Sequence, residues 1–201
     1  MKIWLVVFFV ASALAARDTL QVFGHAWTVP YASDWRIESI KGTPVLELLH
    51  ARGPLPGPRR PIQFALAETP ALKHATLDLD ARPLQKSLIL VFAYRDVEHF
   101  DYAHLSTDAA AAEPHHNGIF HVYGGERVRI SAEEGPAAFP ATQHWYHVRL
   151  MTDAQSGAVQ VYIDGRFIPS LHAVDLSLRG GKIGLGSFDE TAEFKNVKLE
   201  F

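Results

Sequence analysis

The chain has 201 residues, a formal net charge of −3 with neutral histidines, and no cysteine. It therefore holds no disulfide framework, and its charge offers no basic surface of the kind that binds nucleic acid. Its length is that of one domain with room for a full hydrophobic core, and packing in that core must supply the stability.

The first residues have the pattern of an export signal. Lys2 supplies one positive charge, Ile3–Val10 is apolar, and the small residues at 13–15 fit the A-x-A form cut by signal peptidase. The apolar run is shorter than the roughly 20 residues that span a bilayer. We therefore expect a signal peptide at residues 1–15, a mature domain at residues 16–201, a secreted or periplasmic location, and no membrane insertion after cleavage.

Strand patterns then follow one another along the chain. Residues 75–80 alternate apolar and polar side chains, which predicts a half-buried strand, and residues 87–94 are apolar almost throughout, which predicts a strand covered on both faces. Residues 145–151 and 158–163 flank the turn sequence TDAQSG and predict a hairpin, and residues 192–199 alternate again. Because no stretch has convincing helical periodicity, we predict an all-β, antiparallel two-sheet sandwich.

Motifs in the last third of the chain carry a family resemblance. WYHVRLMTDAQSGAVQVYIDGRFI, GGKIGLGSF and AEFKNVKLEF follow one another there. Together they resemble the ending of concanavalin A-like jelly rolls of the laminin-G and glucanase type, in which a tryptophan opens a buried strand. The resemblance implies a jelly-roll fold and a buried position for Trp145. It leaves the activity open, because one fold serves many functions.

The segment DWRIESIKG near the start is similar to the opening of the bacterial 3-keto-disaccharide hydrolase branch of that fold. This resemblance implies a glycoside-acting enzyme of hydrolase or lyase type, in which a base removes a proton beside a ketone. His116–Ile119 stands where that branch has an N-S-G-I segment, without the serine, and the glucanase motif E-x-D-x-x-E is absent. The nearest paired carboxylates are Asp78 and Asp80, which would point to the same face of a strand. They could form a catalytic pair, or they could simply be the polar side chains of a solvent-facing strand.

Histidines and arginines concentrate in the stretch HHNGIFHVYGGERVRIS. Residues 118–123 alternate, a Gly-Gly turn follows, and residues 126–131 alternate again, which predicts a hairpin. We expect its apolar side chains, including Phe120 and Val122, to pack into the sandwich. The opposite, displayed face would then carry His121, Tyr123, Arg127 and Arg129.

Upstream, the alternation in HFDYAHLS places Tyr102 and His104 on one face of another strand. Beside the hairpin, this face would line a groove with aromatic, imidazole and guanidinium groups. Aromatic rings stack on the apolar faces of sugars, and planar donors bind hydroxyl pairs or carboxylates, so the sequence predicts a carbohydrate site. Its expected ligand-binding residues are Tyr102, His104, His116, Asn117, His121, Tyr123, Arg127 and Arg129.

The same histidines could instead hold a metal ion. Zinc takes three or four imidazole, thiolate or carboxylate ligands, and this chain has no thiolate to offer. His104, His116 and His121 could converge on a divalent metal, with Asp101 or Glu126 as a fourth ligand. A histidine-bound metal therefore stands beside the carbohydrate site as an alternative.

Asp189, in the turn sequence GSFDE, offers a carboxylate to the structural calcium that jelly rolls of this type often hold. His104 or His121 could act as an acid or base near neutral pH, and a polar face with no ligand is a further interpretation. We expect an exported carbohydrate-binding domain. A glycoside-acting enzyme that uses histidine acid–base chemistry is the alternative, and no catalytic residue is identified.

Overall fold

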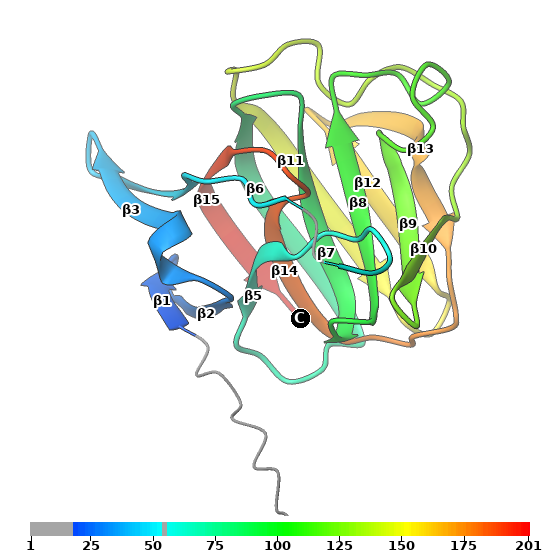
Figure 1. Cartoon of the computed structure of the whole chain (residues 1–201), viewed down its shortest axis with the longest axis horizontal. Helices are drawn as coiled ribbons and strands as arrows, with labels where there is room; N and C mark the ends of the chain where they lie inside the picture. Colours follow the sequence, from blue (N-terminus) through cyan, green and yellow to red (C-terminus); the bar gives the residue numbers. More distant parts are fainter. Residues whose placement is uncertain (1–17, 54–55) are drawn as a thin grey trace, which may run out of the picture.

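Fifteen strands are found in the residues that the structure describes, 18–53 and 56–201. In this computed structural model they form two sheets, of eight and seven strands, packed face to face (Figure 1). All strand pairs within the sheets are antiparallel. The predicted all-β two-sheet sandwich is confirmed, whereas the predicted signal peptide lies outside the described residues.

Each sheet joins strands that are distant in the sequence. In spatial order, the eight-stranded sheet contains β1 (Asp18–Val22), β2 (His25–Val29), β5 (Gln63–Ala67), β14 (Lys182–Ser187), β7 (Ser87–Asp96), β8 (His99–Ser106), β9 (Gly118–Tyr123) and β10 (Glu126–Arg129). The seven-stranded sheet contains β13 (Arg166–Val174), β12 (Ala158–Ile163), β11 (Tyr146–Asp153), β6 (His74–Pro83), β15 (Ala192–Glu200), β4 (Thr43–Leu48) and β3 (Trp35–Ile40), which the short 3-10 helix η1 (Ala32–Asp34) precedes. The described residues contain no helix with the length and apolar character needed to cross a bilayer.

Alternation along the strands places the hydrophobic core between the sheets. In β6, Leu77 and Leu79 are buried in this core, while Asp78 and Asp80 lie on the outer surface of the seven-stranded sheet. Burial of side chains of this size contributes about 1.5 to 3 kcal/mol each. Apolar packing therefore holds the sandwich together, as expected of a chain without cysteine.

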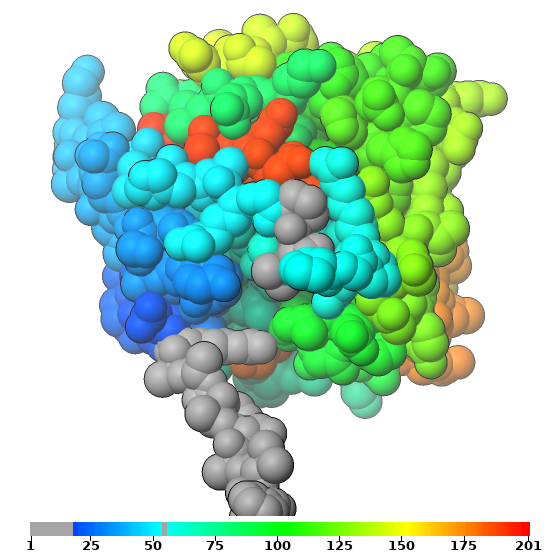
Figure 2. Space-filling view, in the orientation of Figure 1, coloured from blue at the N-terminus to red at the C-terminus, as the bar shows by residue number. Residues whose placement is uncertain are grey.

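Strand β7 is apolar on both faces because a second apolar cluster lies outside the eight-stranded sheet. Leu90 belongs to the inter-sheet core, and its neighbour Val91 belongs to the outer cluster. The outer cluster consists of Phe64, Leu66, Ile89, Val91, Tyr94, Phe100, Tyr102, Phe120, Val122 and Phe188. Segment 56–62 lies across this face of the molecule (Figure 2), where the Arg60 side chain donates to the Val97 carbonyl at 2.7 Å.

Trp145 lies near the surface, which contradicts the buried position that the family resemblance implied. It precedes β11 and is partly exposed, with Lys195 Nζ 4.2 Å and Arg82 Cζ 4.9 Å from its ring centroid. The buried aromatic residue is Tyr146, of which 4% is exposed and whose hydroxyl donates to the Ala141 carbonyl. A shift of one residue along a strand exchanges the two faces, which explains the difference.

We therefore expect Trp145→Ala to lower the free energy of unfolding by only about 1 to 2 kcal/mol, through lost cation–π contacts and partial ring burial. Tyr146→Ala, which empties a core position, should cost about 3 to 5 kcal/mol. Urea denaturation of both variants beside the wild type measures the difference. Equal losses would mean that the two rings are equally buried, against the structure.

Candidate functional site

A polar cleft of about 330 Å³ lies on the outer face of the eight-stranded sheet. Its walls come from segment 56–62, from the connection between β8 and β9, and from the turn that follows β14. The residues that line it are Arg59, His104, Glu113, His115, His116, Arg127, Phe188 and Asp189. Charged and imidazole groups therefore dominate its surface.

Aromatic rings of the outer cluster form the floor beneath these polar groups. The rings of Tyr102 and Phe120 are stacked with centroids 5.2 Å apart, and the ring of Phe188 is stacked on His104 at 5.8 Å. Only 5% of Phe188 is exposed, and Tyr102 is fully buried. These rings support the charged side chains above them and leave little free face on which a sugar could stack.

Arg127 reaches over this floor from the edge strand β10. Its guanidinium carbon lies 4.8 Å from the Phe188 ring centroid, and its Nη1 donates to the Tyr102 hydroxyl at 3.2 Å. Burial raises the pKa of Tyr102 to about 12, so this hydroxyl stays protonated and neutral. Among the described residues, no carboxylate forms an ion pair with Arg127. Most of its hydrogen-bond donors therefore remain for a ligand.

Arg59, from segment 56–62, also lies close to the Phe188 ring. Its guanidinium carbon is 5.2 Å from that ring centroid, and its Nη2 is 2.6 Å from Asp189 Oδ2. The carboxylate that the sequence offered to a structural calcium is thus already paired with an arginine. Because an exposed ion pair of this kind contributes little to stability, a ligand can replace either partner at low cost.

His104 is buried at the base of the cleft and is held from both sides. Its Nδ1 lies 3.1 Å from the His115 carbonyl, and its Nε2 lies 3.0 Å from the Ser87 hydroxyl. That hydroxyl is also 2.7 Å from a carboxylate oxygen of Glu190. Burial, with smaller effects from nearby cationic groups, lowers the pKa of His104 to about 3. It is therefore neutral near pH 7 and is no general acid.

His116 forms the wall of the cleft above His104. Its Nδ1 is 2.9 Å from Asp108 Oδ2, and the two imidazole centroids lie 4.9 Å apart. The hydrogen bond to His116 is the main cause that lowers the pKa of Asp108, and burial opposes it. A carboxylate that holds one imidazole nitrogen fixes the orientation of the ring, so His116 is suited to bind a ligand or to accept a proton.

Two of the predicted ligand-binding residues do not face the cleft but stabilise the connection between β8 and β9. Asn117 is fully buried. Its side-chain Nδ2 donates hydrogen bonds to the Pro136 carbonyl and the Ser170 hydroxyl, and its Oδ1 accepts one from the Ala138 main-chain N–H. The Arg129 side chain donates to the main-chain carbonyls of Pro114, His116, Asn117, Ser131 and Ala132. These contacts fix the connection that carries His116.

His121 and Tyr123 lie on the opposite side of the sheet, so the predicted common face is wrong. The Gly124-Gly125 turn pairs Val122 with Arg127 and Phe120 with Arg129. Directly paired residues share a face, so the two arginines stand with the outer apolar cluster. His121 faces inward, and Tyr123 is 61% exposed with its ring centroid 4.8 Å from that of His99. The two-residue turn could have fixed this register from the sequence.

Other residues of the cleft carried no local signal. Arg59 lies in a Pro-rich and Gly-rich segment, and its ion-pair partner Asp189 is 130 residues away. Asp108 lies in the connection between β8 and β9, and Phe188 follows the end of β14. Only the path of these connections across the sheet brings the four together.

The paired carboxylates of β6 belong to an exposed polar surface. Asp78 lies 2.6 Å from Arg149 and 2.7 Å from His147, and Asp80 accepts a hydrogen bond of 2.7 Å from Asn196. Their charges are thus engaged by neighbours on the outer face of the seven-stranded sheet. The solvent-facing interpretation fits these contacts better than a catalytic pair.

The predicted three-histidine metal set is also divided between the two sides of the sheet. His104 and His116 adjoin the outer cleft, whereas His121 lies on the inner side beside Asp101. The residues whose ligand atoms converge are Asp101, His121 and Asp175, within 4.8 Å of one another. The described residues therefore contain one triad with the donor types of a metal site, and it shares two members with the residues named from the sequence.

No family model matches the chain, and a search of curated proteins gives no match. Solved structures do match. The carbohydrate-binding module CBM66 from Bacillus subtilis superposes with a TM-score of 0.61 at 18% identity, covering 87% of this chain and 95% of its own. A proposed glycosyl hydrolase from Parabacteroides distasonis gives 0.53 at 13% identity, covering 85% and 91%.

A GH43 protein from Bacillus licheniformis has a TM-score of 0.56 at 10% identity, and the match covers 86% of this chain and 36% of that one. At such identities the likeness shows the fold alone. Together with the two antiparallel sheets, it confirms the concanavalin A-like jelly roll that the C-terminal motifs indicated.

Proposed function

We propose that this protein is an exported carbohydrate-binding protein whose ligand occupies the cleft outside the eight-stranded sheet. The observation that carries the proposal is Arg127, whose guanidinium is held over aromatic rings at the cleft and forms no ion pair with the described residues. Arg59 and His116 flank it, so a bound sugar would meet donors from three separate segments. A carbohydrate-binding module among the solved structures of this fold supports a sugar ligand.

Charged side chains, rather than aromatic faces, should recognise this ligand. Phe188 and Tyr102 are almost fully buried beneath the cleft and cannot stack on a sugar ring without rearrangement. A guanidinium binds a carboxylate, or two neighbouring hydroxyls, through two parallel hydrogen bonds. We therefore expect an acidic sugar such as a uronic acid to bind better than its neutral counterpart.

Four of the residues predicted from the sequence remain in the proposed site: Tyr102, His104, His116 and Arg127. Arg127 and His116 would contact the ligand, and the other two would support them from below. Asn117 and Arg129 would act indirectly, because they hold the connection between β8 and β9. The inward position of His121 removes it from this set.

Titration calorimetry with galacturonate and galactose oligomers of equal length tests the proposal. The wild type should bind the acidic oligomers more tightly, and Arg127→Gln should weaken that binding about 10- to 100-fold, the value of a hydrogen bond to a charged group. Arg166→Gln, at an exposed position at the start of β13, is the matched control and should bind like the wild type. Failure of a broad glycan array to detect any ligand would overturn carbohydrate binding.

A glycoside-acting enzyme is a second candidate, favoured by the Asp108–His116 pair at the wall of the cleft. An imidazole held by a carboxylate can serve as the base that removes a proton beside a ketone. Release of a keto-sugar from a 3-keto-glycoside by the wild type, lost in His116→Gln with binding retained, would establish this activity. Binding of the same compound without turnover would contradict the enzymatic function and support carbohydrate binding only.

A further inference from the structure

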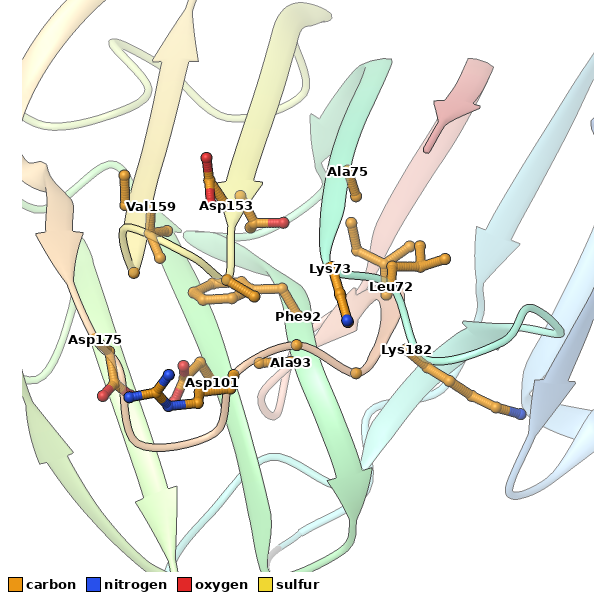
Figure 3. Close-up of a pocket in the computed structure, with 18 residues that line it drawn as sticks. Leu72, Lys73, Ala75, Phe92, Ala93, Asp101, Asp153, Val159, Asp175 and Lys182 are labelled. Carbon is orange, nitrogen blue, oxygen red and sulfur yellow. The ribbon is translucent and has the colours of Figure 1, made fainter.

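Three metal-ligating side chains meet on the inner side of the eight-stranded sheet, away from the cleft. Asp101 lies in β8, His121 stands opposite it in β9, and Asp175 directly follows β13. His121 Nδ1 is 2.7 Å from Asp101 Oδ1 and 3.1 Å from Asp175 Oδ2. Figure 3 shows the two aspartates beside the same cavity at this end of the sandwich.

The triad has an excess of negative charge in a buried place. Only 4% of the Asp101 side chain and 14% of the Asp175 side chain are exposed, and one imidazole faces both. Among the described residues, neither carboxylate forms an ion pair with a lysine or arginine, although Arg179 lines the same cavity. Two buried carboxylates that face a single imidazole carry a desolvation penalty, which a bound cation would offset.

The space beside the triad could hold a fourth ligand for such a cation. Asp101 and Asp175 line a cavity of about 30 Å³, which has room for a water molecule. Ligand atoms on a tetrahedral zinc lie about 3.3 Å apart, given bonds of about 2.0 to 2.1 Å. The separations from the His121 nitrogen, 2.7 and 3.1 Å, would need to widen by about 0.6 and 0.2 Å, and the two carboxylate oxygens, which lie within 4.8 Å of each other, would need to approach by up to about 1.5 Å.

We propose that Asp101, His121 and Asp175 bind a Zn²⁺ ion, with a water molecule in the adjoining cavity as the fourth ligand. One imidazole nitrogen and two carboxylate oxygens suit zinc, whereas calcium takes six to eight oxygen ligands. The inference is independent of the proposed carbohydrate binding, because the triad and the cleft lie on opposite sides of the sheet.

The ion would join the sandwich to the connection between β13 and β14. At present the Asp175 amide donates to the Gly157 carbonyl at 2.9 Å, and Arg95 donates to the Leu178 carbonyl further along the connection. A metal bound to Asp175 as well as to β8 and β9 would hold the start of this connection against the eight-stranded sheet. The site would therefore be structural, closing one end of the sandwich.

Calorimetry and thermal unfolding of chelator-treated protein with ZnCl₂ test the proposal. The wild type should bind one Zn²⁺ per chain, and its Tm should rise by about 5 to 10 °C when free zinc is about 100 times Kd. Asp175→Asn should weaken zinc binding by at least about 10- to 100-fold, the effect known for the less direct second shell of metal sites. CaCl₂ at the same concentration should leave the Tm unchanged.

Glu98→Gln removes an exposed carboxylate at the same end of β8 and should bind zinc like the wild type. If Asp175→Asn does not fold, His121→Gln serves in its place. The proposal is overturned by a wild type that neither binds Zn²⁺ nor gains thermal stability from it. Undiminished binding by both triad variants would also overturn it, because the zinc would then lie elsewhere.

Discussion

Lowering the pH from 6.5 to 4.5 is expected to cost the protein about 2 kcal/mol of stability through His104 alone. The imidazole is fully enclosed, and burial lowers its pKa from 6.5 to about 3. Below pH 6.5 the unfolded chain therefore binds a proton that the folded protein does not. The loss approaches about 1.4 kcal/mol per pH unit between about pH 5.5 and pH 4, and little is lost through this group above about pH 7.

Urea denaturation at pH 7 and pH 4.5 measures this loss against a variant that lacks the imidazole. His104→Gln should be less stable than the wild type at pH 7, because the contacts with Ser87 and the His115 carbonyl change. Its further loss on acidification should be about 2.5 kcal/mol smaller than that of the wild type. His74→Gln, at an exposed position in β6, should keep the wild-type pH dependence. Identical pH dependence in all three proteins would mean that His104 titrates normally in the folded state.

The fold could be predicted because its determinants are local. Alternation in residues 75–80 marked the half-buried strand β6, and the continuous apolar run at 87–94 marked β7, which is covered on both faces. The hairpin of β11 and β12 followed from two β-rich runs around a turn. Each of these patterns depends on side chains that neighbour one another in sequence, so no knowledge of distant contacts was needed.

The assignment of faces failed where a second apolar layer exists. Phe120 and Val122 were expected in the inter-sheet core because apolar side chains usually face it, yet they belong to the outer cluster. Their hairpin partners Arg129 and Arg127 extend over that cluster, with guanidinium carbons 5.6 and 5.8 Å from the Phe120 ring centroid. Hydrophobicity alone cannot distinguish two buried faces, whereas the two-residue turn fixes which side chains stand together.

The contacts that complete the cleft could not be predicted, because they depend on how connections cross the sheet. Arg59 meets Asp189 only because segment 56–62 lies over the outer face. In the same way, Asp175 reaches His121 only because the chain leaves β13 beside β9. Such pairings of loops with distant strands leave no periodic signal in the sequence.

Replacing Arg129 with alanine is expected to lower the free energy of unfolding by about 3 to 5 kcal/mol, because it leaves a set of main-chain carbonyls without their donor. These carbonyls belong to Pro114, His116, Asn117, Ser131 and Ala132, at distances of 2.7 to 3.2 Å from the guanidinium nitrogens. Arg129→Lys keeps the charge but offers three donors in place of five, so it should still cost about 2 kcal/mol.

The neighbouring arginine on the same face of β10 provides the matched comparison. Arg127 donates to one hydroxyl and otherwise faces the cleft, so Arg127→Ala should change stability by less than about 1 kcal/mol while it weakens the proposed sugar binding. Gly118→Ala should resemble the Arg129 variants, since a Cβ there would collide with the Arg129 guanidinium. Urea denaturation and sugar titration of each variant separate the two roles. Arg129 would be a ligand residue, as the sequence first indicated, if its alanine variant kept wild-type stability and lost only binding.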